Sequence, residues 1–155
     1  MLETFKSLFF GETETPRLRP DDDVRLAATV LMVEAASVDG TVDPAEENRI
    51  ALLLRDRFGL SERDARAMQE KARALQEKTS QIYPFTRHVA EHFDADRRIE
   101  MIEMLWEVVL ADGHLHDYEA SLIRRVAGLL YVSDQDSGTA RRRALSRLGL
   151  TGPVA

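Results

Sequence analysis

The stretch "ASVDGTVDPAEEN" (residues 36–48) decides the fold, because it has the residue types of a corner between two helices. Asp39 and Gly40 supply a turn after an apolar helical pattern, and Asp43 followed by Pro44 is typical of a helix start. The same order of residue types returns in "LADGHLHDYEASL" (residues 110–122). Two matched corners predict two matched groups of helices in one chain.

Both corners also match the second half of a calcium-binding EF-hand loop. Such a loop needs oxygen ligands at its first, third and fifth places, glycine at the sixth and glutamate at the twelfth. The later places are filled in both copies, by Asp39, Gly40 and Glu46 and by Asp112, Gly113 and Glu119. The first and third places hold Ala35 and Ser37 in one copy, and Val108 and Leu110 in the other. These residues exclude an ordinary EF-hand in the second copy and disfavour one in the first.

Helix capping explains most of the corner residues without a metal. Gly40 and Gly113 suit the positive φ that a helix exit prefers. Glu46 and Glu119 stand where a capping-box glutamate would accept a hydrogen bond at the start of the next helix. Each corner is therefore consistent with a purely structural role.

Capping does not explain Glu34 and Glu107, which lie on the apolar faces of the helices that lead into the corners. A buried carboxylate must be hydrogen-bonded, paired with a base or bound to a cation. The sequence thus offers six carboxylates for a metal site between the two copies: Glu34, Asp39, Glu46, Glu107, Asp112 and Glu119. Oxygen ligands favour a hard divalent cation, calcium first and magnesium or manganese after it.

Composition limits the class of protein. With 155 residues and 44% hydrophobic side chains, the chain can bury the core of one domain. It has no cysteine, which excludes disulfides, thiol nucleophiles and thiolate metal sites. No apolar run is long enough to cross a membrane, and the net charge of −6 argues against a nucleic-acid partner. We expect a cytoplasmic protein.

Apolar residues recur at helical spacing throughout, and no stretch alternates with the period of a strand. The pattern predicts an all-α chain of about seven helices joined by short connections. Asp43, Ser61, Asp94 and Ser133 are expected to cap four of these helices, and Pro84 suits the first turn of another. The expected helices span residues 24–38, 44–58, 62–79, 84–93, 95–111, 117–132 and 134–148.

The second half of the chain repeats the first, at about residues 24–75 and 97–147. Each copy reads as a helix, an acidic corner, a second helix and a serine-capped helix. We expect the copies to pack about a pseudo-twofold axis within one domain of residues 21–150. Residues 1–20 form a separate amphipathic segment in this interpretation.

The doubled turns "DGxVxxxE" and "DGxLxxxE", each preceded by a helical glutamate, resemble the TerB-like family of tellurite-resistance proteins. The resemblance covers about residues 22–148. It implies a compact helical domain with clustered acidic residues that bind metal, and a role in tellurite or stress response through an unidentified protein partner. A related domain occurs at the cytosolic end of membrane-anchored co-chaperones, which implies a metal-independent interaction module as the alternative.

An enzyme remains a remote alternative. The stretch "HVAEH" (residues 88–92) matches the H-x-x-E-H pattern of inverted zinc peptidases, with His88, Glu91 and His92 as the site of a small zinc hydrolase. His114 and His116 complete two histidine pairs, enough for one tetrahedral zinc if the fold joined them. Five-residue patterns arise often by chance, and no nucleophile arrangement or phosphate-binding glycine loop is present. We expect a non-enzyme.

The N-terminal stretch "LETFKSLFFG" places Leu2, Phe5, Leu8 and Phe9 on one side of a short helix. Such a segment can dock on its own domain, in the groove of a partner, or at a membrane interface through residues 1–10. Docking on its own domain is the first expectation, because large exposed apolar patches are uncommon on monomers.

Overall fold

The computed structural model describes residues 20–37 and 42–150, and within these ranges the chain forms seven helices and no strand. In chain order they are α2 (Pro20–Ala36), α3 (Pro44–Phe58), α4 (Glu62–Lys78), α5 (Tyr83–His92), α6 (Ala95–Val109), α7 (Asp117–Leu129) and α8 (Asp134–Arg147). The predicted all-α fold and its helix order are confirmed. The amphipathic segment predicted for residues 1–20 lies almost entirely outside the described residues, as do Asp39 and Gly40.

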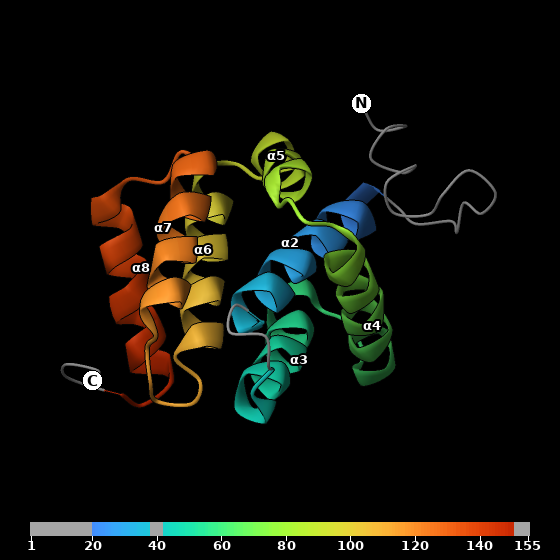
Figure 1. Ribbon diagram of the computed structural model, residues 1–155, viewed down its shortest axis with the longest axis horizontal. Coiled ribbons are helices and arrows are strands. Elements are labelled where there is room, and N and C mark those ends of the chain that lie inside the picture. Colours follow the sequence, from blue (N-terminus) through green and yellow to red (C-terminus); the bar gives the residue numbers. More distant parts are fainter. Residues whose placement is uncertain (1–19, 38–41, 151–155) are drawn as a thin grey trace.

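Two central helices organise the rest. Helix α2 contacts α3, α4, α5, α6 and α7, and α6 contacts α2, α3, α7 and α8. In Figure 1, α6, α7 and α8 form one group of neighbouring helices, α2, α3 and α4 form the other, and α5 lies at the upper end between them. The corner before α3 therefore faces the end of α6 across the junction of the two groups.

The sequences of α2 and α6 explain their central places. Helix α2 is apolar on nearly all sides, and Leu26, Met32 and Ala35 are fully buried in it. In α6 the chain is buried from residue 101 to residue 109, including Trp106, whose Nε1 donates to Oγ of Ser137 at 3.3 Å. A helix that is hydrophobic all round needs partners on every side, which only a central position supplies.

The predicted helix starts are confirmed at four caps. Backbone amides donate to the side chains of Asp43 at 2.7 Å, Ser61 at 3.1 Å, Asp94 at 2.9 Å and Ser133 at 3.1 Å. Each bond satisfies an amide that has no partner within its own helix. Because these caps fix where α3, α4, α6 and α8 begin, they also fix which residues meet at the corners.

The connections that precede the serine caps use the left-handed backbone region in both halves. Gly59 ends α3 with a φ of 68°, and Tyr131, two residues before Ser133, has a φ of 60°. Gly113 has the predicted positive φ, 84°, but it lies in the turn after α6 and not at the helix end, because α6 ends at Val109 with Leu110 as its cap. The order of helices is the same in α2–α4 and α6–α8. A twofold axis between these halves stays a prediction.

Among the described residues, none of the helices combines the length and the apolar character that a crossing of the bilayer requires.

The positive φ at Gly59 generates a prediction about stability. Gly59→Ala should lower the free energy of unfolding by about 1 kcal/mol, because an L side chain disfavours this backbone region. Gly128→Ala, inside α7, should raise it by up to about 1 kcal/mol, because alanine is the better helix former. An added Cβ meets no atom within 4 Å at either site, so the two variants differ in backbone conformation and not in crowding. Urea denaturation would contradict this account if both substitutions changed stability in the same direction.

Candidate functional site

Five of the six carboxylates proposed from the sequence are among the described residues, and their side chains have different neighbours. Glu34, at the end of α2, accepts a hydrogen bond from Nε2 of Gln76 in α4 at 2.8 Å. Asp39 lies outside the described residues. The fold thus gives Glu34 a partner of its own, and its part in a metal site stays an untested prediction.

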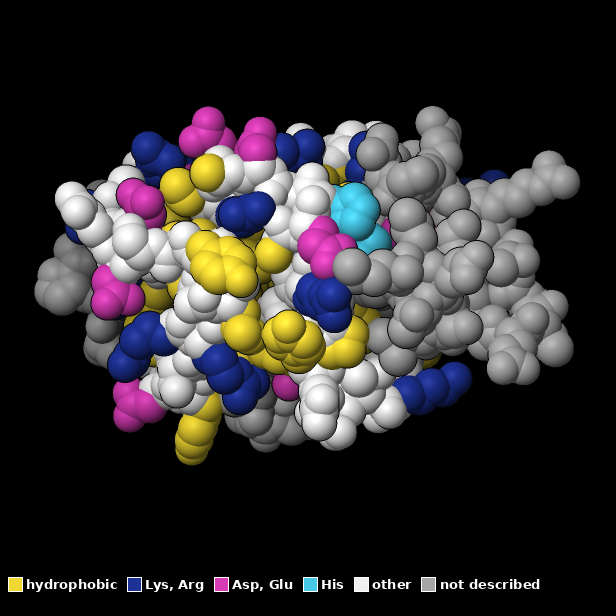
Figure 2. All heavy atoms as spheres, turned by 90° about the horizontal axis from the view of Figure 1, so that it is seen from above, with side chains coloured by type: hydrophobic (Ala, Val, Ile, Leu, Met, Phe, Trp, Pro, Cys, Tyr) yellow, Lys and Arg dark blue, Asp and Glu magenta, His cyan; other side chains and the backbone are white. Residues whose placement is uncertain are grey.

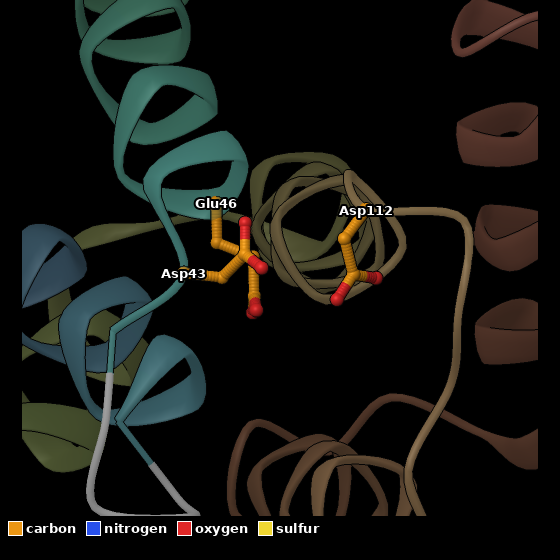
Figure 3. A group of neighbouring side chains, drawn as sticks. All are labelled: Asp43, Glu46 and Asp112. Atoms are coloured by element: carbon orange, nitrogen blue, oxygen red, sulfur yellow. The ribbon is translucent and has the colours of Figure 1, made fainter.

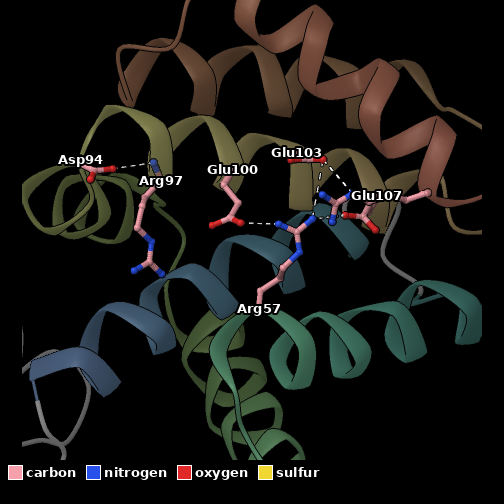
Figure 4. Close-up of polar contacts among 7 residues, drawn as sticks. Arg57, Asp94, Arg97, Glu100, Glu103 and Glu107 are labelled. Atoms are coloured by element: carbon pink, nitrogen blue, oxygen red, sulfur yellow. Dashed lines mark hydrogen bonds and ion pairs between the residues drawn. The ribbon is translucent and has the colours of Figure 1, made fainter.

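Glu107 belongs to an ion-pair network between α3 and α6. Its side chain is only 2% exposed, and its oxygens lie 3.3 Å from Nη2 of Arg57 and 3.8 Å from Nη1 of Arg49. Arg57 also pairs with Glu100 at 2.5 Å and with Glu103 at 3.9 Å (Figure 4). Arg57 therefore pairs with three acidic residues of α6. These contacts give the buried Glu107 carboxylate a basic partner without a metal.

Burial and ion pairing have opposite effects on the pKa values of the buried glutamates in this network. Burial raises the pKa of Glu103 and of Glu107, whereas Arg57 beside both carboxylates works to lower it. Glu103 gains a second partner in Nε of Arg147 at 3.2 Å, which links α8 to the same network. Arg57 and Arg147 thus join α3 and α8 to α6. The sequence did not single out Arg57, because its partners lie more than forty residues away along the chain.

The structure does bring together carboxylates from the two corners. Oxygen atoms of Asp43, Glu46 and Asp112 all lie within 4.8 Å of one another (Figure 3). Asp43 caps α3, Glu46 lies in the first turn of that helix, and Asp112 follows α6. The sequence predicted Glu46 and Asp112 as site residues, whereas Asp43 was expected only as a cap.

Glu119 forms a side-chain hydrogen bond with Glu46, and we call Asp43, Glu46, Asp112 and Glu119 together the corner cluster. Glu46 is its most constrained member. It is 4% exposed, and its Oε1 is buried without a hydrogen-bond partner among the described residues. Burial first, and then the charge and hydrogen bond of Glu119, raise the pKa of Glu46 to about 9. A carboxyl group in this position holds a proton at neutral pH unless a cation takes its place.

Glu119 differs from Glu46 in its local contacts. It accepts a hydrogen bond from the backbone amide of His116 at 3.1 Å, which confirms the capping contact predicted at the start of α7. Burial raises its pKa, while the His116 amide and the side chain of Glu46 act in the opposite direction. Glu46 thus carries the proton of the pair and donates a hydrogen bond to the carboxylate of Glu119. Glu46 was predicted to close the capping box of the first corner. It faces the second corner instead.

The corner cluster has the chemistry of a hard-cation site. Calcium binds oxygens at about 2.3–2.6 Å, so two ligands on opposite sides of the ion lie about 5 Å apart. The spacing within 4.8 Å is compatible with this arrangement. Oδ1 of Asp43 and Oδ1 of Asp112 each cap a backbone amide, at 2.7 and 2.9 Å, which holds both carboxylates in place. No lysine or arginine of the described residues forms an ion pair with the corner cluster.

The histidine pattern in α5 is arranged differently. The rings of His88 and His92 stack with centroids 4.1 Å apart, as expected for one helical face, but His88 is buried at 5% exposure. Burial lowers the pKa of His88 to about 4, and the neighbouring His92 adds to this effect. Glu91 pairs with Arg87 at 3.0 Å. The one metal-capable group found among the described residues contains no histidine.

Comparison with known proteins gives a family and a fold. The family model described as "Tellurite resistance protein TerB" matches residues 25–142. A crystal structure of a protein of unknown function from Porphyromonas gingivalis W83 is similar with a TM-score of 0.60 and 16% identity. It covers 89% of this chain and 95% of that one, which at this identity supports the fold alone. No curated protein matches the sequence.

The raised pKa of Glu46 predicts how stability depends on pH. Between its ordinary pKa of 4.5 and its folded pKa of about 9, the folded chain holds a proton that the unfolded chain has released. The free energy of unfolding therefore falls as pH rises through this window, by at most about 1.4 kcal/mol per pH unit for one proton. Glu46→Gln should remove this slope, because an amide does not titrate.

Urea denaturation at several values between pH 7.5 and 8.5 measures the slope, at least one unit above the ordinary pKa of 6.5 at which His88 titrates in the unfolded chain. Glu47→Gln is the matched control on the same helix. Its exposed ion pair with Arg73, at 2.7 Å, contributes little to stability at any pH in this range. Equal slopes in the native chain and in Glu46→Gln would contradict the assignment of a proton to Glu46.

The α3–α6 network generates a second prediction. Arg57→Met should lower the free energy of unfolding by about 3 kcal/mol, because it leaves Glu103 and Glu107 buried without their shared base. Arg66→Met, which breaks an exposed pair with Glu62, should cost less than about 0.5 kcal/mol. Chemical denaturation compares the two, and a smaller loss for Arg57→Met than for Arg66→Met would overturn the role given to Arg57.

Proposed function

The chain belongs to the TerB family, and from that premise we propose that it is a non-enzymatic domain whose corner cluster binds a hard divalent cation, calcium first. In this proposal the domain acts in the cytoplasm on a protein partner, in the tellurite resistance that the family name gives or in a related stress response. The ligands are Asp43, Glu46 and Asp112, with Glu119 beside them. Three of these four residues, Glu46, Asp112 and Glu119, belong to the six predicted from the sequence, and Asp43 is added.

One observation carries the proposal: a buried carboxyl oxygen, Oε1 of Glu46, lies among other carboxylates and has no hydrogen-bond partner among the described residues. Bringing these acidic groups together is unfavourable unless protons or a cation neutralise them. A divalent cation would satisfy Oε1 and reduce the repulsion in one step. Oxygen-only ligation of this kind suits calcium, magnesium or manganese better than zinc.

The position of the corner cluster suggests what binding would do. Asp43 and Glu46 belong to the corner before α3, while Asp112 and Glu119 flank the corner between α6 and α7. A cation held by both corners would link the two groups of helices and stabilise their packing. We propose that this link, and not a chemical reaction, is the functional output that a protein partner reads.

A metal-independent interaction module is the second candidate, and the Glu46–Glu119 pair favours it. A proton on Glu46, hydrogen-bonded to Glu119, reduces much of the same repulsion between carboxylates without any cation. In that case the corner cluster is a structural element, and the domain serves only as a protein-interaction or membrane-proximal co-chaperone-like module. The two candidates differ in whether a cation displaces the proton.

Calorimetric titration with calcium, magnesium, manganese and zinc tests the proposal. Glu46→Gln and Asp112→Asn should each weaken calcium binding at least tenfold, equivalent to about 1.4 kcal/mol, because each removes a charged ligand. Asp117→Asn, in the same corner as Asp112 but outside the corner cluster, is the matched control and should bind like the native chain. Glu34→Gln tests the wider set and should also leave affinity unchanged if Gln76 is the only partner of that residue.

Absence of both heat and a melting-temperature shift up to millimolar metal would refute cation binding and leave the metal-independent candidate. Calcium binding that is unchanged in both Glu46→Gln and Asp112→Asn would show that calcium binds outside the corner cluster. Zinc binding lost in His92→Gln would instead support the small zinc hydrolase built on His88, Glu91 and His92.

A further inference from the structure

Tyr131 occupies a position where glycine would fold better. Its φ of 60° is the single positive value among the non-glycine residues that the structure describes, and its side chain is 83% exposed. An L residue in this region costs about 1 kcal/mol, and an exposed ring recovers little of that by packing. At the corresponding place in the first half, before Ser61, the chain uses Gly59. An aromatic residue kept at an unfavourable position indicates a binding role.

Tyr131 lines a groove with a second exposed tyrosine. Tyr83, at the start of α5, is 54% exposed. The groove has a volume of about 440 Å3, and its apolar surface comes from Tyr83, Ala90, Gly128, Leu129 and Tyr131. Arg87 and Glu91, paired at 3.0 Å, provide a charged rim. Figure 2 looks onto this end of the molecule and shows hydrophobic side chains gathered on it between charged ones.

The chain itself supplies a segment that fits this groove. The sequence before α2 carries Leu2, Phe5 and Phe9, spaced so that a helix would present them on one side. The start of α2, helix α5 and the end of α7 all lie toward the same upper end of the molecule in Figure 1. Residues 13–19 can span about 23 Å when extended, compared with a radius of gyration of about 15 Å for a domain of this size.

We propose that residues 1–12 of the chain dock in this groove, with the rings of Phe5 and Phe9 packed against Tyr83 and Tyr131. Aromatic pairs stabilise a contact by more than the burial of their apolar area alone. The charged rim lies at the edge of the groove, where the polar side of the segment would remain in contact with water. A tethered segment needs only modest contacts, because a short linker gives it a millimolar effective concentration at its site. Docking would cover the exposed rings of Tyr83 and Tyr131 together.

Hydrogen exchange of residues 2–10 in the full-length chain, read by mass spectrometry, tests this proposal. The amides should be protected in the native chain, and the double substitution Tyr83→Ala with Tyr131→Gly should reduce that protection about tenfold or more. Tyr118→Ala is the matched control, because Tyr118 is also exposed, at 63%, and does not line the groove. It should leave the protection unchanged. The melting temperature of Tyr131→Gly should equal or exceed that of the native chain, so loss of protection would not reflect unfolding.

Free-chain exchange of residues 2–10 in the native protein would overturn the proposal. So would protection that persists in the double variant, because the segment would then dock elsewhere. Protection that rises with protein concentration would place the segment on a second copy, and protection seen only with vesicles of phosphatidylglycerol and phosphatidylethanolamine would place it on a membrane. Either result contradicts docking within one chain.

Discussion

A buried carboxylate must be paired, protonated or bound to a cation, and this constraint determines how the two halves of the domain meet. Helix α6 is buried on nearly all sides and still carries Glu103 and Glu107. Arg57 of α3 compensates both of them, so the ion pairs orient α3 along α6. With α3 held there, its first turn faces the end of α6, and Glu46 lies close to Asp112. The corner cluster thus lies at one end of an interface that Arg57 and Arg49 also connect.

The same constraint has a different solution at each acidic residue. Glu34 accepts a hydrogen bond from the side-chain amide of Gln76, and Glu107 pairs with arginines. Glu46 carries a proton and forms a hydrogen bond with Glu119. The first two arrangements are complete within the fold. The corner cluster is the least complete, because Oε1 of Glu46 has no partner among the described residues. This difference is why the proposed cation site is placed at Glu46 and not at Glu34 or Glu107.

The helices could be predicted from the sequence because their signals are local. Asp43, Ser61, Asp94 and Ser133 cap helices that begin where expected, since capping depends only on residues within one turn. The partners of Glu34 and Glu107 could not be predicted, because Gln76 and Arg57 lie on other helices and become neighbours only after packing. Asp43 was missed as a site residue for the same reason. Its capping role was visible, and its approach to Asp112 was not.

The central claim is that the corner cluster is a cation site joining the two halves. A crystal of the full-length chain soaked in manganese and measured at the manganese absorption edge tests it most directly. The account predicts one strong anomalous peak, bonded to oxygens of Asp43, Glu46 and Asp112, that disappears in Glu46→Gln. A peak at other residues, or no peak in crystals whose corner cluster is open to solvent, would contradict it.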